Sequence, residues 1–179
     1  GKSFICKDDK INSQIIKKIK TKNFYTYGTK KDSNFVIRNI RHFRDMSIFD
    51  VIISLPGKKK ITLKNINIPL LGLHNIRNAT AAVAVAFTIG ISNEIIKNSL
   101  INFQGVQRRF NKIFNYRGVS FFDDYAHHPT EIKELINGVH EVYRKEKIYC
   151  VFQPHRISRL KDLRKEFSSS FSKTEAVIL

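Results

Sequence analysis

The residues between Val119 and Glu131 combine carboxylates, a tyrosine and two imidazoles, which are side chains suited to binding a polar ligand. Pro129 suits the first position of a helix, because its missing N–H has no partner there. His128 is then expected at or beside the N-cap. The polar residues before it are expected on a strand-to-helix loop: Asp123, Asp124, Tyr125 and His127. Ligands bind at such loops in open α/β sheets. A loop that merely solvates a strand end explains any one of these residues alone, but explains the group less well.

A second candidate site contains two asparagines on one predicted helix. A helix rich in small residues is predicted from Leu70 to Phe87, and its alanines allow close packing on a sheet. Asn75 and Asn78 are three residues apart, so they share one face near the beginning of this helix. Two side-chain amides can pair donors and acceptors with the edge of a heterocycle. On spacing alone, an equally good interpretation makes Asn75 the N-cap and Asn78 incidental.

Upstream of this helix the pattern is mixed. Residues 9–20 carry isoleucines at helical spacing, and residues 24–27 look like a strand that ends at Gly28. Residues 34–69 hold several strand patterns separated by turn residues, which predicts a small, mostly antiparallel appendage. Downstream of the helix, residues 103–110 have no strong periodicity, and we place a domain boundary there.

The last part of the chain alternates strand and helix patterns, which predicts an α/β domain with a parallel sheet. Arg117 and Gly118 predict a tight hairpin turn. The apolar run at 148–152 is typical of a strand buried on both faces of a parallel sheet. The expected elements, in order, are a strand at 111–116, a buried apolar strand at 119–122, a helix from Pro129, a strand at 148–152, a helix at 160–171 and a strand at 176–179.

The composition sets limits on the class of protein. The chain has 179 residues with 32 Lys and Arg against 15 Asp and Glu, a formal charge of +17 that permits nucleic-acid binding. The lysines are scattered and are not interleaved with aromatic residues, so a basic nucleic-acid-binding module is the less favoured alternative. Cys6 and Cys150 lie far apart in apolar runs, as expected of reduced thiols in a cytoplasmic protein. No apolar run approaches the roughly 20 residues needed to span a bilayer.

Four segments, taken together and in order, resemble the Mur ligases, the ATP-dependent enzymes that form amide bonds in the peptide stem of peptidoglycan. They are Gly72–Ala79, Phe103–Phe110, Asp123–Thr130 and Phe152–Arg159. The resemblance implies that residues 1–105 are the C-terminal part of a P-loop-type central ATPase domain. Residues 106–179 would be the first part of a Rossmann-like C-terminal domain. The family's phosphate-binding loop, metal ligands and UDP-binding domain match nothing here, so these residues alone are expected to be inactive.

The resemblance also implies roles for single residues. Asn75 and Asn78 would lie at the adenine of ATP, and Arg109, the second of the adjacent pair Arg108 and Arg109, would contact phosphate and act in catalysis. Asp124 would accept hydrogen bonds from the ribose, which leaves Asp123 to stabilise the backbone of the loop or the start of the helix. His127 is the other catalytic candidate. The residues expected to face the substrates are Tyr125, His127, His155, Arg156 and Arg159.

The implied cofactors are ATP and Mg²⁺, with the metal ligands outside this chain. Within the family, the strings favour the member that joins L-alanine to UDP-N-acetylmuramate. A related ligase that recycles murein tripeptide stays open as an alternative, because it shares the histidine-containing loop. It usually has a Glu-Pro-Arg-Ser type of string where this chain has Gln153-Pro154-His155-Arg156.

Overall fold

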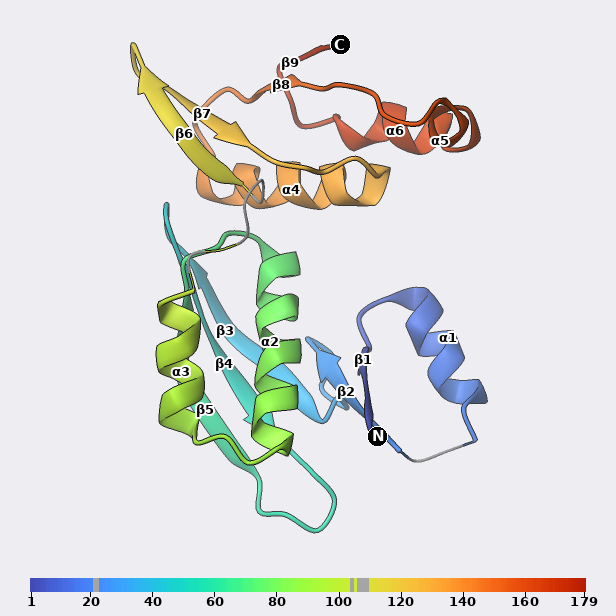
Figure 1. Cartoon of the computed structure of the whole chain (residues 1–179), viewed down its shortest axis with the longest axis vertical. Helices are drawn as coiled ribbons and strands as arrows, with labels where there is room; N and C mark the ends of the chain where they lie inside the picture. The colour runs from blue at the N-terminus through green and yellow to red at the C-terminus, as the bar shows by residue number, and fades with distance from the viewer. Residues whose placement is uncertain (21–22, 104, 106–109) are drawn as a thin grey trace. The chain divides into compact units, whose positions relative to one another are not determined.

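The computed structural model describes residues 1–20, 23–103, 105 and 110–179, which form two compact units (Figure 1). The first unit comprises Gly1–Leu70 and His74–Phe103, and the second comprises Leu71–Leu73 and the described residues after Phe103. None of the helices in the described ranges has the length and apolarity to cross a membrane. Each unit is built around its own apolar core, so each is described separately.

The first unit contains one five-stranded sheet and three helices. Its elements are β1 (Ser3–Cys6), α1 (Lys10–Lys18), β2 (Phe24–Gly28), β3 (Phe35–His42), β4 (Ser47–Ile53), β5 (Ile61–Ile68), α2 (Leu73–Thr88) and α3 (Asn93–Ile101). The strand order is β1-β2-β3-β4-β5; β1, β2 and β3 run parallel, whereas β3, β4 and β5 are antiparallel. The antiparallel strands were predicted, but they are not an appendage, because the β2–β3 pairing makes them one sheet with β1 and β2.

The core of this unit lies between β3–β5 and the helices α2 and α3, which cover one face of the sheet (Figure 1). Phe35, Phe49 and Ile66 of the sheet and Ile76 and Val83 of α2 are fully buried. Alternate residues of a strand point to one face, so the apolar positions of β3 and β4 meet the apolar stripe of α2. The core therefore fixes α2 against the middle of the sheet.

A buried carboxylate on β4 holds two irregular points of the sheet. Asn39 and Asn65 have positive φ angles of 51° and 53°, next to register shifts in the β3–β4 and β4–β5 pairings. Asn39 Nδ2 donates to Asp50 Oδ2 at 2.7 Å, and the Asn65 N–H donates to Asp50 Oδ1 at 2.7 Å. Asp50 is only 7% exposed, so both bulges depend on an acceptor that water does not replace.

Asp50→Asn is expected to lower the free energy of unfolding by about 2 kcal/mol, because hydrogen bonds to an ionised acceptor are worth about 1.5–3 kcal/mol each. Chemical denaturation measures this change. Asp32→Asn is the control, because Asp32 pairs with Lys7 at the surface, with a side chain that is 72% exposed, and surface pairs contribute little. Equal destabilisation by the two substitutions would contradict a special role for Asp50.

The second unit contains two small sheets and three helices. Its elements are β6 (Asn111–Tyr116), β7 (Val119–Asp123), α4 (Pro129–Val142), β8 (Tyr149–Val151), α5 (Ile157–Asp162), α6 (Arg164–Ser170) and β9 (Ala176–Ile178). β6 and β7 form an antiparallel hairpin whose turn residues Arg117 and Gly118 both have positive φ, as predicted. β8 and β9 pair in parallel, which is the predicted direction. Ile132 and Ile136 of α4 pack with Phe152 and Phe167 in the core.

Three details of the second unit differ from the prediction. β7 was expected to be a buried strand, but Val119 is 54% and Phe121 41% exposed. β8 was expected to be buried on both faces, but Cys150 contacts the core while Val151 is 78% exposed. The core of the second unit contains no described residue of β6 or β7, whereas β8 contributes Cys150 to that core and leaves Val151 exposed on its other face. The predicted helix 160–171 is two short helices that meet at Leu163.

The two cysteines are free thiols, as expected. Cys6 lies on β1 in the first unit and Cys150 on β8 in the second, and both are half-buried. Burial raises the pKa of the Cys150 thiol, which favours the protonated thiol over the more reactive thiolate.

Candidate functional site

The beginning of α4 is built by the local sequence. His128 is the N-cap, and its Nδ1 accepts from the Thr130 N–H at 3.3 Å, while Pro129 occupies the first helical position. Glu131 Oε2 accepts from the backbone N–H of His128 at 3.3 Å and of His127 at 3.1 Å. This capping box satisfies donors that would otherwise have no partner at the helix start. It fixes the loop that carries the acidic and imidazole side chains.

Asp124 holds this loop closed. Its Oδ1 accepts from the Ala126 N–H at 2.7 Å, and its Oδ2 accepts from the Phe110 N–H at 2.8 Å. Asp124 therefore stabilises the loop backbone, a role that was expected of Asp123, because β7 ends at Asp123 and the chain turns at Asp124. A carboxylate has about four acceptor sites, and these two N–H groups each occupy one acceptor site of Asp124.

Phe110 lies in a backbone conformation that is unusual for an aromatic residue. Its φ angle is 53°, and its ring stacks on Phe122 with centroids 4.3 Å apart. The stacking and the bond to Asp124 over-determine this conformation, and such strained residues cluster at functional sites. The predicted phosphate-binding Arg109 and its neighbour Arg108 lie outside the residues that the structure describes, so their roles stay predictions.

Tyr125, His127 and Arg159 come together at this loop. The Tyr125 and His127 rings lie 5.0 Å apart, and His127 Nδ1 lies 2.9 Å from the Tyr125 carbonyl oxygen. A carbonyl only accepts, so Nδ1 carries the hydrogen, and Nε2 of neutral His127 is left as an acceptor. Arg159 Nη1, from α5, donates to the His127 carbonyl at 3.2 Å. The Arg159 guanidinium suits a carboxylate or a developing oxyanion, whereas the acceptor Nε2 of His127 suits an N–H or O–H donor.

His155 and Arg156 lie just before α5 and are exposed. Arg156 has a φ angle of 64°, an unusual value for a residue other than glycine, and it makes no side-chain cap bond to α5. The structure thus places both residues on the segment that leads to Arg159. A strained arginine before a helix is a feature of binding sites.

Arg159→Ala, made in the complete protein to which this chain belongs, is expected to lower kcat/KM for a carboxylate substrate about fivefold. The loss of one hydrogen bond of about 1 kcal/mol accounts for this size. Arg144→Ala is the control, because the Arg144 side chain lies just beyond α4 and donates from Nε to the nearby Glu141 carbonyl. Steady-state kinetics of both variants test the expectation, which fails if the control loses as much as Arg159→Ala.

On the first unit, Asn75 and Asn78 lie in the first turns of α2. The helix begins at Leu73, so Asn75 is inside the first turn, and the alternative that made it the N-cap is wrong. Asn78 is exposed and Asn75 is half-buried. Both amides stand near the positive end of the helix dipole, where electron-rich ligand atoms are favoured. Their donors and acceptors fit the edge of an adenine ring.

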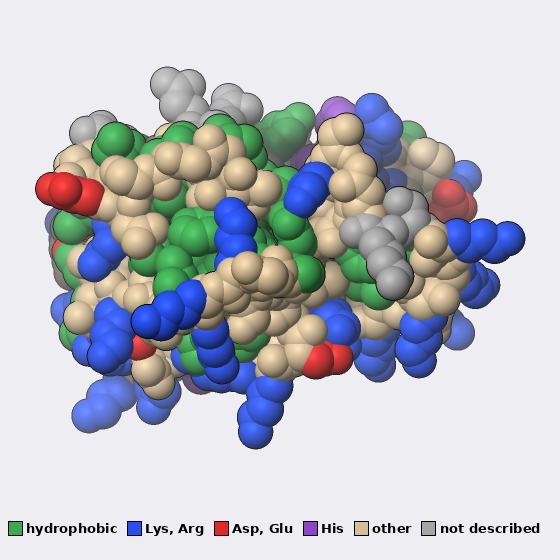
Figure 2. Space-filling model, turned by 90° about the horizontal axis from the view of Figure 1, so that it is seen from below, with side chains coloured by type: hydrophobic (Ala, Val, Ile, Leu, Met, Phe, Trp, Pro, Cys, Tyr) green, Lys and Arg blue, Asp and Glu red, His purple; other side chains and the backbone are tan. Residues whose placement is uncertain are grey.

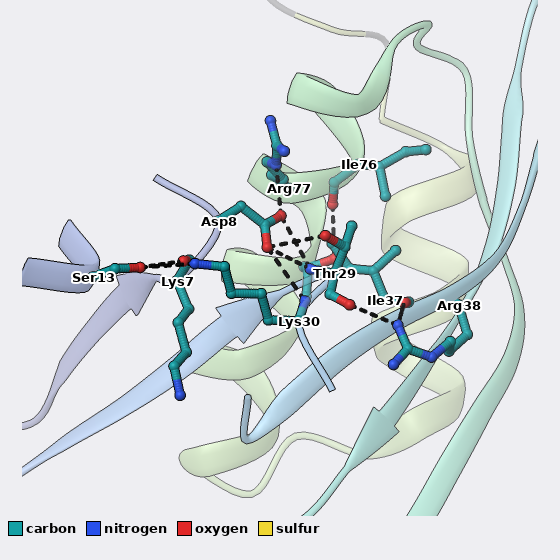
Figure 3. A network of polar contacts seen from close by, with 10 residues as sticks. Lys7, Asp8, Ser13, Thr29, Lys30, Ile37, Arg38, Ile76 and Arg77 are labelled. Atoms are coloured by element: carbon teal, nitrogen blue, oxygen red, sulfur yellow. Dashed lines mark hydrogen bonds and ion pairs between the residues drawn. The ribbon is translucent and has the colours of Figure 1, made fainter. Parts of the chain in front are cut away.

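One polar network near this helix was not predicted from the sequence (Figure 3). The Asp8 carboxylate accepts from the backbone N–H groups of Thr29 at 2.8 Å and Lys30 at 3.3 Å, and from Arg77 Nε of α2 at 2.9 Å. Asp8 follows β1, and Thr29 follows β2. The ends of adjacent parallel strands meet at one edge of a sheet, so Asp8 lies beside Thr29. The sequence feature that could have predicted this network is the aspartate that follows the first strand.

The surface and the metal-ligand residues add two observations. On the face shown in Figure 2, Lys and Arg side chains stand at several separate places with uncharged surface between them.

Within the described ranges, no three or more His, Cys, Asp or Glu side chains are arranged to hold a metal ion. The predicted site residues therefore offer donors and acceptors for organic and phosphate groups, and no metal ligand set is found among the described residues.

Comparison with known proteins gives the same family at both ends of the chain. Residues 1–86 match the Mur ligase middle domain, and residues 108–179 match the Mur ligase, glutamate ligase domain. UDP-N-acetylmuramate–L-alanine ligase of Pelagibacter ubique is 62% identical over 179 residues, which are 100% of this chain and 39% of that protein. The ligase of the same name from Bartonella tribocorum is 37% identical over 180 residues and is covered to 38%.

Solved structures agree with these relatives. UDP-N-acetylmuramate–alanine ligase of Thermotoga maritima aligns with 86% of this chain and 33% of its own, with a TM-score of 0.67 and 28% identity. MurF of Acinetobacter baumannii covers 99% of this chain and 42% of its own with a TM-score of 0.73, and at 20% identity it shows the fold alone. The chain thus spans about two-fifths of the length of its curated relatives, 39% and 38%. It belongs to the Mur ligase family, and it covers parts of the middle domain and of the glutamate ligase domain.

Proposed function

We propose that this chain is part of an ATP-dependent ligase that joins L-alanine to UDP-N-acetylmuramate in peptidoglycan synthesis. Members of the Mur ligase family use ATP. The observation that carries the proposal is the 62% identity, over all 179 residues, to a protein named as this ligase in Pelagibacter ubique. In this proposal, residues 1–105 belong to the central ATP-binding domain and residues 106–179 to the C-terminal domain.

The described residues fit the roles that this reaction requires. Asn75 and Asn78 would hold the adenine edge, and Asp124 would accept from the ribose hydroxyls. Arg159 and the Nε2 atom of His127 would bind and orient the reacting carboxylate and the amine of L-alanine. The guanidinium favours the negative charge that develops on the carboxylate oxygens, and the fixed imidazole can receive a proton from the attacking amine.

The chemistry proceeds in two steps. The carboxylate of UDP-N-acetylmuramate attacks the γ-phosphate of ATP to give an acyl phosphate and ADP. The amine of L-alanine then displaces phosphate through a tetrahedral intermediate. Mg²⁺ would supply neutralisation of the phosphate charge, and its ligands are proposed to lie elsewhere in the complete protein. Arg109 is proposed to contact a phosphate in the first step.

The test uses the complete protein that contains this chain. ADP release is measured with UDP-N-acetylmuramate as the acceptor and L-alanine as the added amine, and with murein tripeptide in place of L-alanine. ADP release that depends on L-alanine, with the amide product confirmed by mass spectrometry, supports the proposal. Turnover with the tripeptide but not with L-alanine would assign the recycling activity instead, and turnover with neither would overturn the proposal.

A further inference from the structure

We propose that Asp8 and Arg77 are a positioning pair that sets the rotation of α2 and thereby the direction in which Asn75 and Asn78 present their amides. The inference rests on the proposed function, because it serves the adenine side of the nucleotide site. It adds two residues that touch no substrate and act through the helix. Four observations on the first unit support it.

The first observation is how completely Asp8 is enclosed. Its side chain is 5% exposed, and its carboxylate accepts from Thr29 N–H, Thr29 Oγ1, Lys30 N–H and Arg77 Nε (Figure 3). The Arg77 side chain is 28% exposed. Removing charges from water offsets much of the attraction in such a pair, so its net contribution to stability is small. What the pair does provide is one defined geometry between the ends of β1 and β2 and the second turn of α2.

The second observation is that the strand end is shaped for this carboxylate. Gly28, the last residue of β2, has a φ angle of 142°, and a Cβ atom there would lie 2.5 Å from Asp8 Oδ1. Any side chain at this position would displace the Asp8 carboxylate from the Thr29 N–H. The glycine therefore allows Asp8 to lie over the end of β2.

The third observation is the unfavourable place of Arg77 in its own helix. A cation in the first turns of a helix opposes the helix dipole, and α2 has no acidic residue in its first turn. Asp8, which is 69 residues away in the sequence, supplies the compensating charge from the sheet edge. The pair thus joins α2 by an ion pair to the segment between β1 and α1.

The fourth observation concerns the side chains on the buried face of α2. Much of this face consists of small side chains, the buried residues being Ile76, Ala79, Thr80, Val83 and Ala84. Core packing of these residues sets which side of α2 lies on the sheet, and the ion pair adds a charged contact near the beginning of the helix. Each residue turns the helix by about 100°, and the helix moves as one body, so any rotation that frees Arg77 turns Asn75 and Asn78 by the same angle.

The experiment separates positioning from stability in the complete protein. Arg77→Gln and Asp8→Asn are expected to raise KM for ATP about five- to tenfold, with kcat changed less than twofold. Arg77→Lys keeps the charge and should recover part of the loss. The double variant should be no worse than the worse single variant, because both remove the same interaction.

Asp50→Asn is the matched control. Asp50 is also a buried carboxylate that holds two segments of the same sheet, but it accepts hydrogen bonds from Asn39 and Asn65 and not from α2. It is expected to lower the melting temperature and leave KM for ATP unchanged. The inference is overturned if Asp50→Asn raises KM as much as Arg77→Gln, or if the Arg77 and Asp8 variants lose stability without any change in KM.

A binding measurement keeps this inference apart from the proposed function. Calorimetric titration with ADP needs no turnover, so it reports on the pair even if L-alanine is not the amine substrate. A complete protein that binds ADP normally after Arg77→Gln overturns the inference alone. A wild-type protein that binds ADP but does not consume L-alanine overturns the proposed substrate alone, and a wild-type protein that binds no ADP overturns both.

Discussion

Arg109→Ala, in the complete protein, is expected to lower kcat/KM for ATP by about 100- to 1000-fold with little loss of stability. The proposed role of Arg109 is a contact with a phosphate whose charge develops in the first step, and removing one such stabilising donor costs about this much in other enzymes. The residue after it, Phe110, is fixed by ring stacking and by the Asp124 carboxylate. Steady-state kinetics with ATP as the varied substrate measure the effect, and thermal melting measures stability.

Arg108→Ala is the matched control for this prediction. The two arginines are neighbours in the sequence, so the two variants lose the same charge at adjacent positions and have the same amino-acid composition as each other. It is expected to change kcat/KM less than threefold. Equal kinetic losses from the two variants would show that the phosphate is bound by both residues or by neither in the proposed way.

Local sequence rules predicted the parts of the fold that local contacts determine. The start of α4 was predicted from Pro129, and the β6–β7 turn was predicted from Arg117 and Gly118. Each of these features depends on residues within a few positions of one another, so the sequence pattern contains most of the cause. Local contacts also determine the start of α3, where the Ser92 side chain is the N-cap.

Pairings between distant strands could not be predicted in the same way. The pattern of residues 34–69 indicated antiparallel strands but not that β3 also pairs with β2 in parallel. Strand neighbours are decided by packing of the whole sheet, and α2 covers that sheet with residues that come after it in the chain. Exposure of β7 was missed for a related reason, because an apolar pattern does not reveal whether a second layer covers it.

The candidate site shows the same division. His127 was identified by its residue type and Arg159 by the resemblance, and the structure brings them together through one hydrogen bond. The Asp8–Arg77 pair was missed, because it joins residues 69 positions apart and neither lies in a pattern of its own. The resemblance assigned the ribose to Asp124 and left the loop backbone to Asp123, whereas the structure shows that Asp124 holds the backbone just after β7 ends.

Asp124→Asn is expected to damage both stability and nucleotide use in the complete protein. The two Asp124 oxygens each accept from a backbone N–H, of Ala126 at 2.7 Å and of Phe110 at 2.8 Å. An asparagine has one oxygen, so its NH₂ group would face one of these donors. We expect a loss of about 2–3 kcal/mol in the free energy of unfolding, since hydrogen bonds to charged groups have this value. KM for ATP should rise about 30-fold, which corresponds to roughly 2 kcal/mol.

The ribose role of Asp124 is separated from its loop role by the choice of nucleotide. If the carboxylate accepts from the ribose hydroxyls, the wild-type protein should prefer ATP to 2′-deoxy-ATP about tenfold, and Asp124→Asn should lose most of this preference. Asp123→Asn is the control; Asp123 is exposed at the end of β7, and the variant should keep both the preference and the melting temperature. An Asp124→Asn variant that is destabilised but still discriminates between the two nucleotides would show that Asp124 only holds the loop. In that case the ribose contact must come from another residue.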